Sequence, residues 1–138
     1  AGFWAAFIHP VRNALDHGIE TPAERAERGK SADGRLSIAV RGDAQAITVE
    51  LIDDGRGIDF EKVRAKAQAL GLPHASEAQL IEALFHQGFT TSDHATELSG
   101  RGIGMSALRE AARKLGGVVS LSSKVNQGTT LRVRFPAS

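Results

Sequence analysis

The first part of the chain carries an apolar stripe with helical spacing, which predicts an amphipathic helix over residues 2–18. The stripe consists of Phe3, Phe7, Val11 and Leu15. Pro10 interrupts this pattern. Because proline has no amide donor and a fixed φ, we expect the helix to kink or restart near it. A polar segment follows, in which residues 22–29 favour a short helix.

Two alternating segments then predict a pair of β-strands. Their hydrophobic positions are Leu36, Ile38 and Val40 in the first strand and Ile47, Val49 and Leu51 in the second. Between the two strands stand Gly42 and Asp43, which are typical turn residues. We therefore expect an antiparallel hairpin.

The second half of the chain has the same order of helices followed by strands. Its patterns predict helices over 60–70, 76–84 and about 103–115, and strands over 118–123 and 129–135. Ser76 is the expected N-cap of the second of these helices. Residues 86–101 are polar, irregular and too long for a plain connector, so they form a candidate functional lid.

The order of elements predicts the fold class. Helices and strands in separate runs are typical of an α+β protein, here a two-layer α/β sandwich in which helices cover one face of a mixed, mostly antiparallel sheet. The strand–helix alternation of a doubly wound nucleotide-binding fold is missing. We expect one domain over residues 1–138.

Composition narrows the possible functions. The chain has 17 Lys and Arg against 16 Asp and Glu, a net charge of +1, which argues against broad nucleic-acid binding. No apolar run is long enough for a membrane span, and the absence of cysteine excludes a disulfide scaffold and fits a reducing compartment such as the cytoplasm. The 15 glycines are an excess over the usual share of about 7% and gather in clusters.

One face of the first helix is polar. His9, Asn13 and His17 recur every four residues, on the side opposite the apolar stripe. This pattern fits a solvated helix face. It also fits a site for a metal-bound polyanion, because an Asn carbonyl oxygen can bind Mg²⁺ and histidine can donate to phosphate.

A carboxylate and two alternating glycines follow the second strand. Asp53 can accept a hydrogen bond from the exocyclic amine of adenine, and Gly55 and Gly57 would let a flat ligand approach the backbone. A plain turn explains the same residues. We expect Asp54, the next residue, to face solvent.

A second glycine cluster leads into a helix. Alternating glycines at a helix start expose N–H groups to a phosphate, but they also serve as a hinge. Upstream, two phenylalanines and three hydroxyl residues fit a lid with phosphate donors or a pinned surface loop. These residues are Phe85, Phe89, Thr90, Thr91 and Ser92 in the lid segment and Gly100, Gly102 and Gly104 in the cluster.

The sequence contains, in this order, His-x-x-x-Asn, Asp-x-Gly-x-Gly, Phe-x-x-Gly-Phe, Gly-x-Gly-x-Gly and Gly-Thr. This order resembles the ATP-binding boxes of the gyrase/Hsp90/histidine-kinase/MutL superfamily. Within it, the chain most resembles the kinase domain of chemotaxis-type (CheA-like) histidine kinases, through residues 11–20, 88–91 and 99–105. The resemblance extends from His9 to Pro136.

The resemblance implies a Bergerat-type ATP-binding fold and the cofactors ATP and Mg²⁺. By position, Asn13 matches the magnesium ligand, His9 and His17 match residues near the phosphates, and Asp53 matches the carboxylate that reads adenine. Matches to the base pocket are Gly55, Gly57, Ile58 and the supporting Thr129. Matches to the lid and phosphate loop are Phe89, Thr90, Ser92, Gly100, Arg101, Gly102, Ile103 and Gly104.

Two lysines on the following helix match phosphate-facing positions. Lys62 and Lys66 are one turn apart, so both ammonium groups can reach one anion. A solvated charged face explains the same pair. The chain departs from the family at Pro10, where an aliphatic residue is usual, and at Ser106, where an acidic residue is usual.

His9 distinguishes between two kinds of reaction. Members that hydrolyse ATP carry a glutamate there as general base, so histidine as the catalytic residue favours phosphoryl transfer to a protein. The resemblance implies a protein-histidine kinase domain that phosphorylates a histidine on a separate phosphoacceptor domain. Two alternatives remain: a superfamily ATPase that hydrolyses ATP, and a degenerate nucleotide-binding interaction module.

The resemblance also implies partners. We expect an excised fragment, weak or inactive alone, whose parent kinase supplies phosphoacceptor, dimerisation and receptor-coupling domains. A response regulator would act downstream in this two-component pathway. None of the five histidines lies in a plausible phosphoacceptor helix. We expect neither nucleic acid nor membrane insertion.

Overall fold

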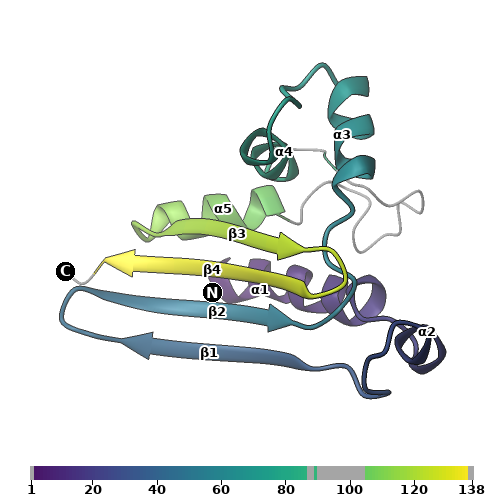
Figure 1. Cartoon of the computed structure of the whole chain (residues 1–138). Helices are drawn as coiled ribbons and strands as arrows, with labels where there is room; N and C mark the ends of the chain where they lie inside the picture. The colour runs from purple at the N-terminus through teal and green to yellow at the C-terminus, as the bar shows by residue number, and fades with distance from the viewer. Residues whose placement is uncertain (1, 87–88, 90–104, 137–138) are drawn as a thin grey trace. The chain divides into compact units, whose positions relative to one another are not determined.

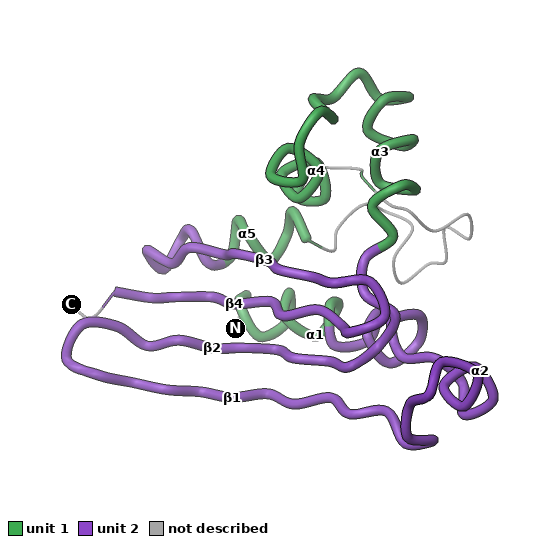
Figure 2. Tube along the Cα trace, viewed as in Figure 1, with its two compact units in different colours: residues 1–10, 59–111 green, residues 11–58, 112–138 purple. Residues whose placement is uncertain are grey.

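A computed structural model describes residues 2–86, 89 and 105–136 of the chain. Its contacts divide it into two compact units, which are described separately (Figure 2). The first unit comprises residues 1–10 and 59–111, and the second comprises residues 11–58 and 112–138. Two helices, α1 and α5, cross from one unit into the other along the chain. Among the described residues, no helix is long and apolar enough to cross a membrane.

The second unit contains a four-stranded sheet (Figure 1). Its strands are β1 (Leu36–Gly42), β2 (Ala46–Asp53), β3 (Val118–Lys124) and β4 (Gly128–Pro136). The strand order is β1-β2-β4-β3, and all three pairings are antiparallel. The predicted strands and the first hairpin are thus confirmed, and the described sheet is antiparallel throughout. With its helices it is an α+β protein consistent with the Bergerat ATP-binding fold.

One face of the two central strands supplies the buried residues of the sheet. Val49 pairs with Val133 and Leu51 with Leu131, and all four side chains are buried. On the edge strand β1, Ile38 pairs with Leu51 but is 54% exposed. The buried hydrophobic residues of the sheet therefore lie on its two central strands, β2 and β4.

The opposite face of the sheet carries a buried acid. Glu50 is 5% exposed, and its carboxylate accepts hydrogen bonds from Arg41 on β1 and from Arg132 on β4 at 2.6–2.8 Å. Because both oxygens have cationic partners, burial of this charge is compensated. Glu50 thereby joins three adjacent strands through side chains.

The first helix runs to its predicted end but changes its winding. α1 (Gly2–Asn13) passes through Pro10 without a restart and continues as a π-helical turn, η1 (Ala14–Gly18). The Ile19 N–H donates to the Ala14 carbonyl, five residues back, at 2.9 Å. The wider turn rotates later side chains out of the α-helical phase. The predicted stripe therefore holds for Phe3 and Phe7 and is wrong for Leu15, which is 58% exposed.

The remaining predicted helices are confirmed where the structure describes them. They are α2 (Pro22–Glu27), α3 (Phe60–Ala69), α4 (Glu77–Leu84) and α5 (Met105–Lys114). Ser76 caps α4 as predicted and forms a capping box with Gln79. In the first unit, the Arg109 guanidinium of α5 pairs with Glu82 of α4 and lies 4.3 Å from the ring centre of Phe85. The predicted lid over 86–101 lies almost wholly outside the described residues.

We predict that Leu51→Ala lowers the free energy of unfolding by about 2–5 kcal/mol, because it leaves a cavity among the buried residues of β2 and β4. Its cross-strand neighbour Ile38 is a matched control, since Ile38→Ala removes an exposed side chain from the same face. Urea unfolding of both variants measures the difference. Equal losses would contradict the placement of the core on the two central strands.

Candidate functional site

Asp53 ends the central strand β2 and is the best oriented of the predicted site residues. The Gly55 N–H donates to its Oδ1 at 2.9 Å, and the Thr129 N–H donates to the same carboxyl group. The register places Thr129 of β4 directly opposite Asp53. Two backbone donors, one local and one from the neighbouring strand, therefore fix the direction of this carboxylate.

Burial raises the pKa of Asp53 above its ordinary value. The hydrogen bonds from Gly55 and Thr129 act in the opposite direction, and the nearby charges of Asp54 and Glu20 raise the pKa further. The half-buried carboxylate is thus poorly solvated, which strengthens any hydrogen bond that it accepts from a ligand. A carboxylate perturbed in this way is a candidate for function rather than for a plain turn.

The two glycines after Asp53 are required by contacts within the protein. A Cβ on Gly55 would lie 2.1 Å from the Gly18 carbonyl oxygen, and a Cβ on Gly57 would lie 2.3 Å from the Lys124 carbonyl oxygen. Gly57 also has a φ of +77°, which favours glycine. The turn lies between two backbone segments, so packing alone explains both residues. Their contact with a flat ligand stays a prediction.

One of these segments is the end of the first helix. The Arg56 N–H donates to the Gly18 carbonyl at 2.8 Å, which attaches η1 to the turn after β2. Asn13, the last residue of α1, and His17 within η1 are both exposed. The Asn13 side chain makes no capping hydrogen bond. Two of the predicted residues thus belong to a helix end that is joined to the Asp53 turn.

The other segment is the turn between β3 and β4. The Asn126 N–H donates to the Arg56 carbonyl at 2.8 Å. A Cβ on Gly128 would lie 1.9 Å from the Asp53 carbonyl oxygen, and Gly128 has a φ of +112°. The Gly-Thr motif therefore brings Thr129 to Asp53 by close backbone packing.

Ser123 is a site residue that the sequence analysis missed. It pairs with Thr129 in the register of β3 and β4, and their hydroxyl oxygens are 3.0 Å apart. The Ser123 hydroxyl also accepts a hydrogen bond from the Ile58 N–H at 2.8 Å. Asp53, Thr129 and Ser123 form one row across three strands. Only the strand register reveals this row.

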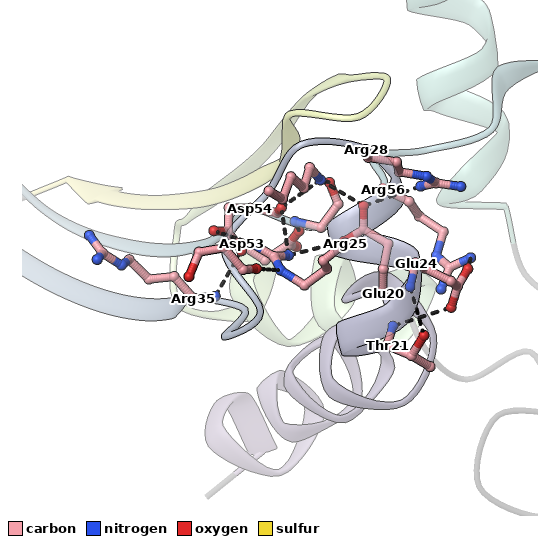
Figure 3. A network of polar contacts seen from close by, with 12 residues as sticks. Glu20, Thr21, Glu24, Arg25, Arg28, Arg35, Asp53, Asp54 and Arg56 are labelled. Atoms are coloured by element: carbon pink, nitrogen blue, oxygen red, sulfur yellow. Dashed lines mark hydrogen bonds and ion pairs between the residues drawn. The ribbon is translucent and has the colours of Figure 1, made fainter.

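A group of buried charges next to the turn was also missed (Figure 3). The Glu20 carboxylate is fully buried and pairs with Arg25 at 3.1 Å, with Arg28 at 3.2 Å and with Lys30 at 2.6 Å. Arg25 also binds Asp54 Oδ2 at 3.0 Å. The expectation that Asp54 faces solvent is therefore only partly correct, since its side chain is 44% exposed but holds an ion pair.

The pKa of Glu20 is shifted opposite to that of Asp53. Burial alone would raise it, but the hydrogen bond from Lys30, the backbone N–H of Glu20 itself, the charge of Lys30 and the hydrogen bond from Arg28 lower the pKa to about 2. Glu20 is thus a carboxylate whose charge is compensated, whereas Asp53 has no cationic partner among the described contacts. The two acids therefore differ in their surroundings: the charge of Glu20 is compensated by cations, whereas Asp53 has only backbone donors among the described contacts.

The other predicted residues lie in the first unit or outside the described residues. His9 is half-buried on α1, and Phe89 is buried. Lys62 and Lys66 lie one turn apart on α3, as predicted, with Lys62 the more exposed. The predicted lid and phosphate-loop residues outside the described part are Thr90, Ser92, Gly100, Arg101, Gly102, Ile103 and Gly104.

The described residues hold no group of three or more His, Asp or Glu side chains that could bind a metal ion by themselves. The amide oxygen of the exposed Asn13 side chain, which makes no capping hydrogen bond, would fit Mg²⁺ as one ligand, with the others taken from phosphate and water.

Comparison with known proteins identifies the family of this chain. Residues 5–138 match the family described as histidine kinase-, DNA gyrase B- and HSP90-like ATPases. The chain is 42% identical to the gliding motility regulatory protein of Myxococcus xanthus, with 96% of the chain covered. It is 37% identical to the chemotaxis protein CheA of Halobacterium salinarum and 40% identical to that of Treponema pallidum, with 95% and 94% covered. It spans only 18%, 20% and 16% of the lengths of these three relatives.

The opposite pKa shifts give a test of the two acids. Stability contributed by ionised Glu20 is present above its ordinary pKa of 4.5 and is lost as the pH falls toward 2. We predict that Glu20→Gln lowers the free energy of unfolding at pH 7 by roughly 2 kcal/mol, less than the full shift implies because one of its partners, Arg28, is partly exposed and screened by solvent. This deficit should disappear near pH 2.

Asp53→Asn is the matched variant. The raised pKa of Asp53 means that its ionisation destabilises the folded state as the pH rises. Replacing the carboxyl group by a neutral amide should therefore leave the free energy of unfolding at pH 7 unchanged or higher. Urea unfolding between pH 2 and 8 measures both variants. Two outcomes would contradict the assignment of opposite pKa shifts to Glu20 and Asp53. One is a similar loss of unfolding free energy in both variants, and the other is a loss in Glu20→Gln that persists at pH 2.

Proposed function

Because the chain belongs to the family of histidine kinase-, DNA gyrase B- and HSP90-like ATPases, we propose that it is the ATP-binding catalytic domain of a chemotaxis-type histidine kinase. The proposed reaction transfers the γ-phosphoryl group of Mg-ATP to a histidine on a separate phosphoacceptor domain. The observation that carries this proposal is the orientation of the Asp53 carboxylate by Gly55 and Thr129 at the end of β2.

Asp53 supplies the base-reading group. An ionised carboxylate is an acceptor only, so it pairs with the exocyclic amine of adenine. Guanine carries a carbonyl oxygen at that ring position, and two acceptors facing each other in a poorly solvated place cost free energy. Gly55, Gly57 and Ile58 would surround the base, with Thr129 supporting the carboxylate.

The end of the first helix supplies the phosphate side of the proposed site. Asn13 would offer its amide oxygen to Mg²⁺, and His17 would donate to phosphate oxygens. Bound Mg²⁺ supplies charge neutralisation for the phosphates. Lys62 and Lys66 are proposed to add further positive charge from α3. Phosphoryl transfer needs mainly positioning and charge stabilisation, which suits such a set of residues.

His9 is the proposed catalytic residue. It stands one helical turn before Asn13 on α1, half-buried. An imidazole at this position can relay a proton, and it stands where the members that hydrolyse ATP carry a glutamate, so transfer to a protein acceptor is favoured over hydrolysis. Phe89, Thr90, Ser92 and residues 100–104 are proposed to contribute to nucleotide binding.

The proposed partners come from the rest of a larger kinase. The curated relatives are five to six times as long as the stretch that this chain matches. We propose that the parent protein supplies the phosphoacceptor, dimerisation and receptor-coupling domains, that a response regulator receives the phosphoryl group, and that the kinase acts in the cytoplasm. The isolated chain should then bind nucleotide but autophosphorylate little.

Nucleotide binding is the first test. We predict that the chain binds Mg-ATP and that Asp53→Asn weakens this binding at least about tenfold. An amide has only one acceptor oxygen, so its NH₂ group must face either the adenine amine or the backbone N–H donors of Gly55 and Thr129, and both are donors. Isothermal titration calorimetry measures both, with the exposed Asp33→Asn as a control of equal charge change. Undetectable ATP binding by the wild-type chain would refute the proposal, and an unaltered affinity in Asp53→Asn would place adenine recognition elsewhere.

Phosphoryl transfer is the second test. With labelled ATP and a supplied phosphoacceptor domain, we expect label on the acceptor histidine, loss of that label in Asn13→Ala, and reduced transfer in His9→Ala. Phosphate release is measured in parallel without the acceptor. Rapid release that His9→Ala abolishes would favour an ATPase instead, while binding with neither transfer nor release would favour a degenerate interaction module.

A further inference from the structure

The peptide group between Asp54 and Gly55 is held from both sides. On one side, the Asp54 carbonyl oxygen accepts hydrogen bonds from Lys30 Nζ at 3.0 Å and from Arg25 Nη1 at 3.3 Å. On the other side, the N–H of Gly55 donates to Asp53 Oδ1 at 2.9 Å. A trans peptide unit is planar and its C=O and N–H point in opposite directions. Fixing the carbonyl therefore also fixes the direction of the N–H.

The two cations are themselves fixed by a buried acid. Glu20 Oε1 accepts from Arg25, and Glu20 Oε2 accepts from Lys30. Lys30 Nζ makes a further bond to the Gly55 carbonyl at 2.8 Å. Arg25, 1% exposed, uses its remaining nitrogens on the Ser31 carbonyl and on Asp54 Oδ2. Their donors are thus engaged within the protein rather than directed to a ligand.

We propose that Lys30 and Arg25, held by Glu20, are positioning residues for adenine recognition. They orient the Asp54–Gly55 peptide group so that the Gly55 N–H fixes the Asp53 carboxylate toward the base. This inference rests on the proposed function for its adenine part, whereas the orientation of the peptide group is a property of the protein alone. Figure 3 shows Arg25 beside Asp53 and Asp54, with Glu20 next to it.

A purely structural role for these charges predicts a different outcome. If the cluster only joins α2 to the sheet, then its loss lowers stability and leaves the folded protein with the same nucleotide selectivity. If the cluster orients the Asp54–Gly55 peptide group, its loss weakens the hydrogen bond from the Gly55 N–H to Asp53 and reduces the discrimination between adenine and guanine. Stability and selectivity are therefore measured separately.

The chain offers a matched control within the same cluster. Arg28 pairs with Glu20 Oε2, as Lys30 does, but none of its described hydrogen bonds involves the Asp54–Gly55 peptide group. Arg28→Met and Lys30→Met remove the same charge from the same acid. Only the second removes donors from the carbonyl groups of Asp54 and Gly55. Lys30→Arg restores donors and serves as the rescue.

The first measurement needs no nucleotide. Hydrogen exchange of the Gly55 amide, followed by NMR, should accelerate at least about tenfold in Lys30→Met and change less than about twofold in Arg28→Met and Lys30→Arg. Thermal melting shows up to which temperature each variant stays folded, and exchange is measured below that temperature. If Lys30→Met does not fold, Lys30→Gln, whose amide can reach fewer acceptors, takes its place. Unchanged Gly55 exchange in the folded variant would overturn the proposal.

The second measurement is the ratio of the dissociation constants for Mg-ATP and Mg-GTP, obtained by calorimetric competition. We expect Lys30→Met to reduce the preference for ATP at least about fivefold and Arg28→Met to retain it. Retained preference in Lys30→Met would show that the peptide group does not control base selection. If the wild-type chain binds neither nucleotide, the proposed function fails, and the Gly55 exchange still decides the positioning role.

Discussion

The contact between the turn after β2 and the end of the first helix is the constraint on which the candidate site depends. The backbone of this turn lies so close to the Gly18 carbonyl that no side chain fits at Gly55. On the other side, the turn between β3 and β4 leaves no room for a side chain at Gly57. Three segments distant in sequence thus meet with their backbones in close contact. This packing brings Asn13, Asp53 and Thr129 into one part of the second unit.

Electrostatics then assigns different roles to acids that are near one another. Glu20 is fully buried, and its two oxygens pair with three cations. The pKa of Glu20 is therefore lowered to about 2, so the carboxylate stays ionised at a pH where an ordinary glutamate is protonated. Asp53 is half-buried with only backbone donors, so its carboxylate is poorly solvated and retains capacity to accept a further hydrogen bond. Removing one partner of a buried ion pair leaves an uncompensated charge, so the cations around Glu20 depend on it, whereas a partly compensated carboxylate such as Asp53 is a candidate for ligand binding. The same sheet end therefore combines a rigid support with a group available for recognition.

Much of the fold was predictable because its signals are local. Residue patterns indicated all four strands, and Ser76 indicated the start of α4. The exception was Leu15, for which α-helical spacing predicted burial. The π-helical turn at residues 14–18 is defined by a hydrogen bond between residues five apart at the helix end. No residue type in this stretch predicts such a turn. Periodicity alone cannot detect such a change in winding.

The sequence by itself determined the order of elements, the motifs and the prominence of Asp53 among the acids, because these follow from residue type and short spacing. Only the tertiary structure decided how Asp53 is supported. Ser123 reaches Thr129 through the strand register, and Lys30 reaches the carbonyl groups of Asp54 and Gly55 from another part of the chain. Hydrogen bonds of this kind depend on distances and peptide orientations that long-range packing sets. A lysine and a serine carry no local pattern that distinguishes them from ordinary surface residues, so their contribution became visible only in the folded protein.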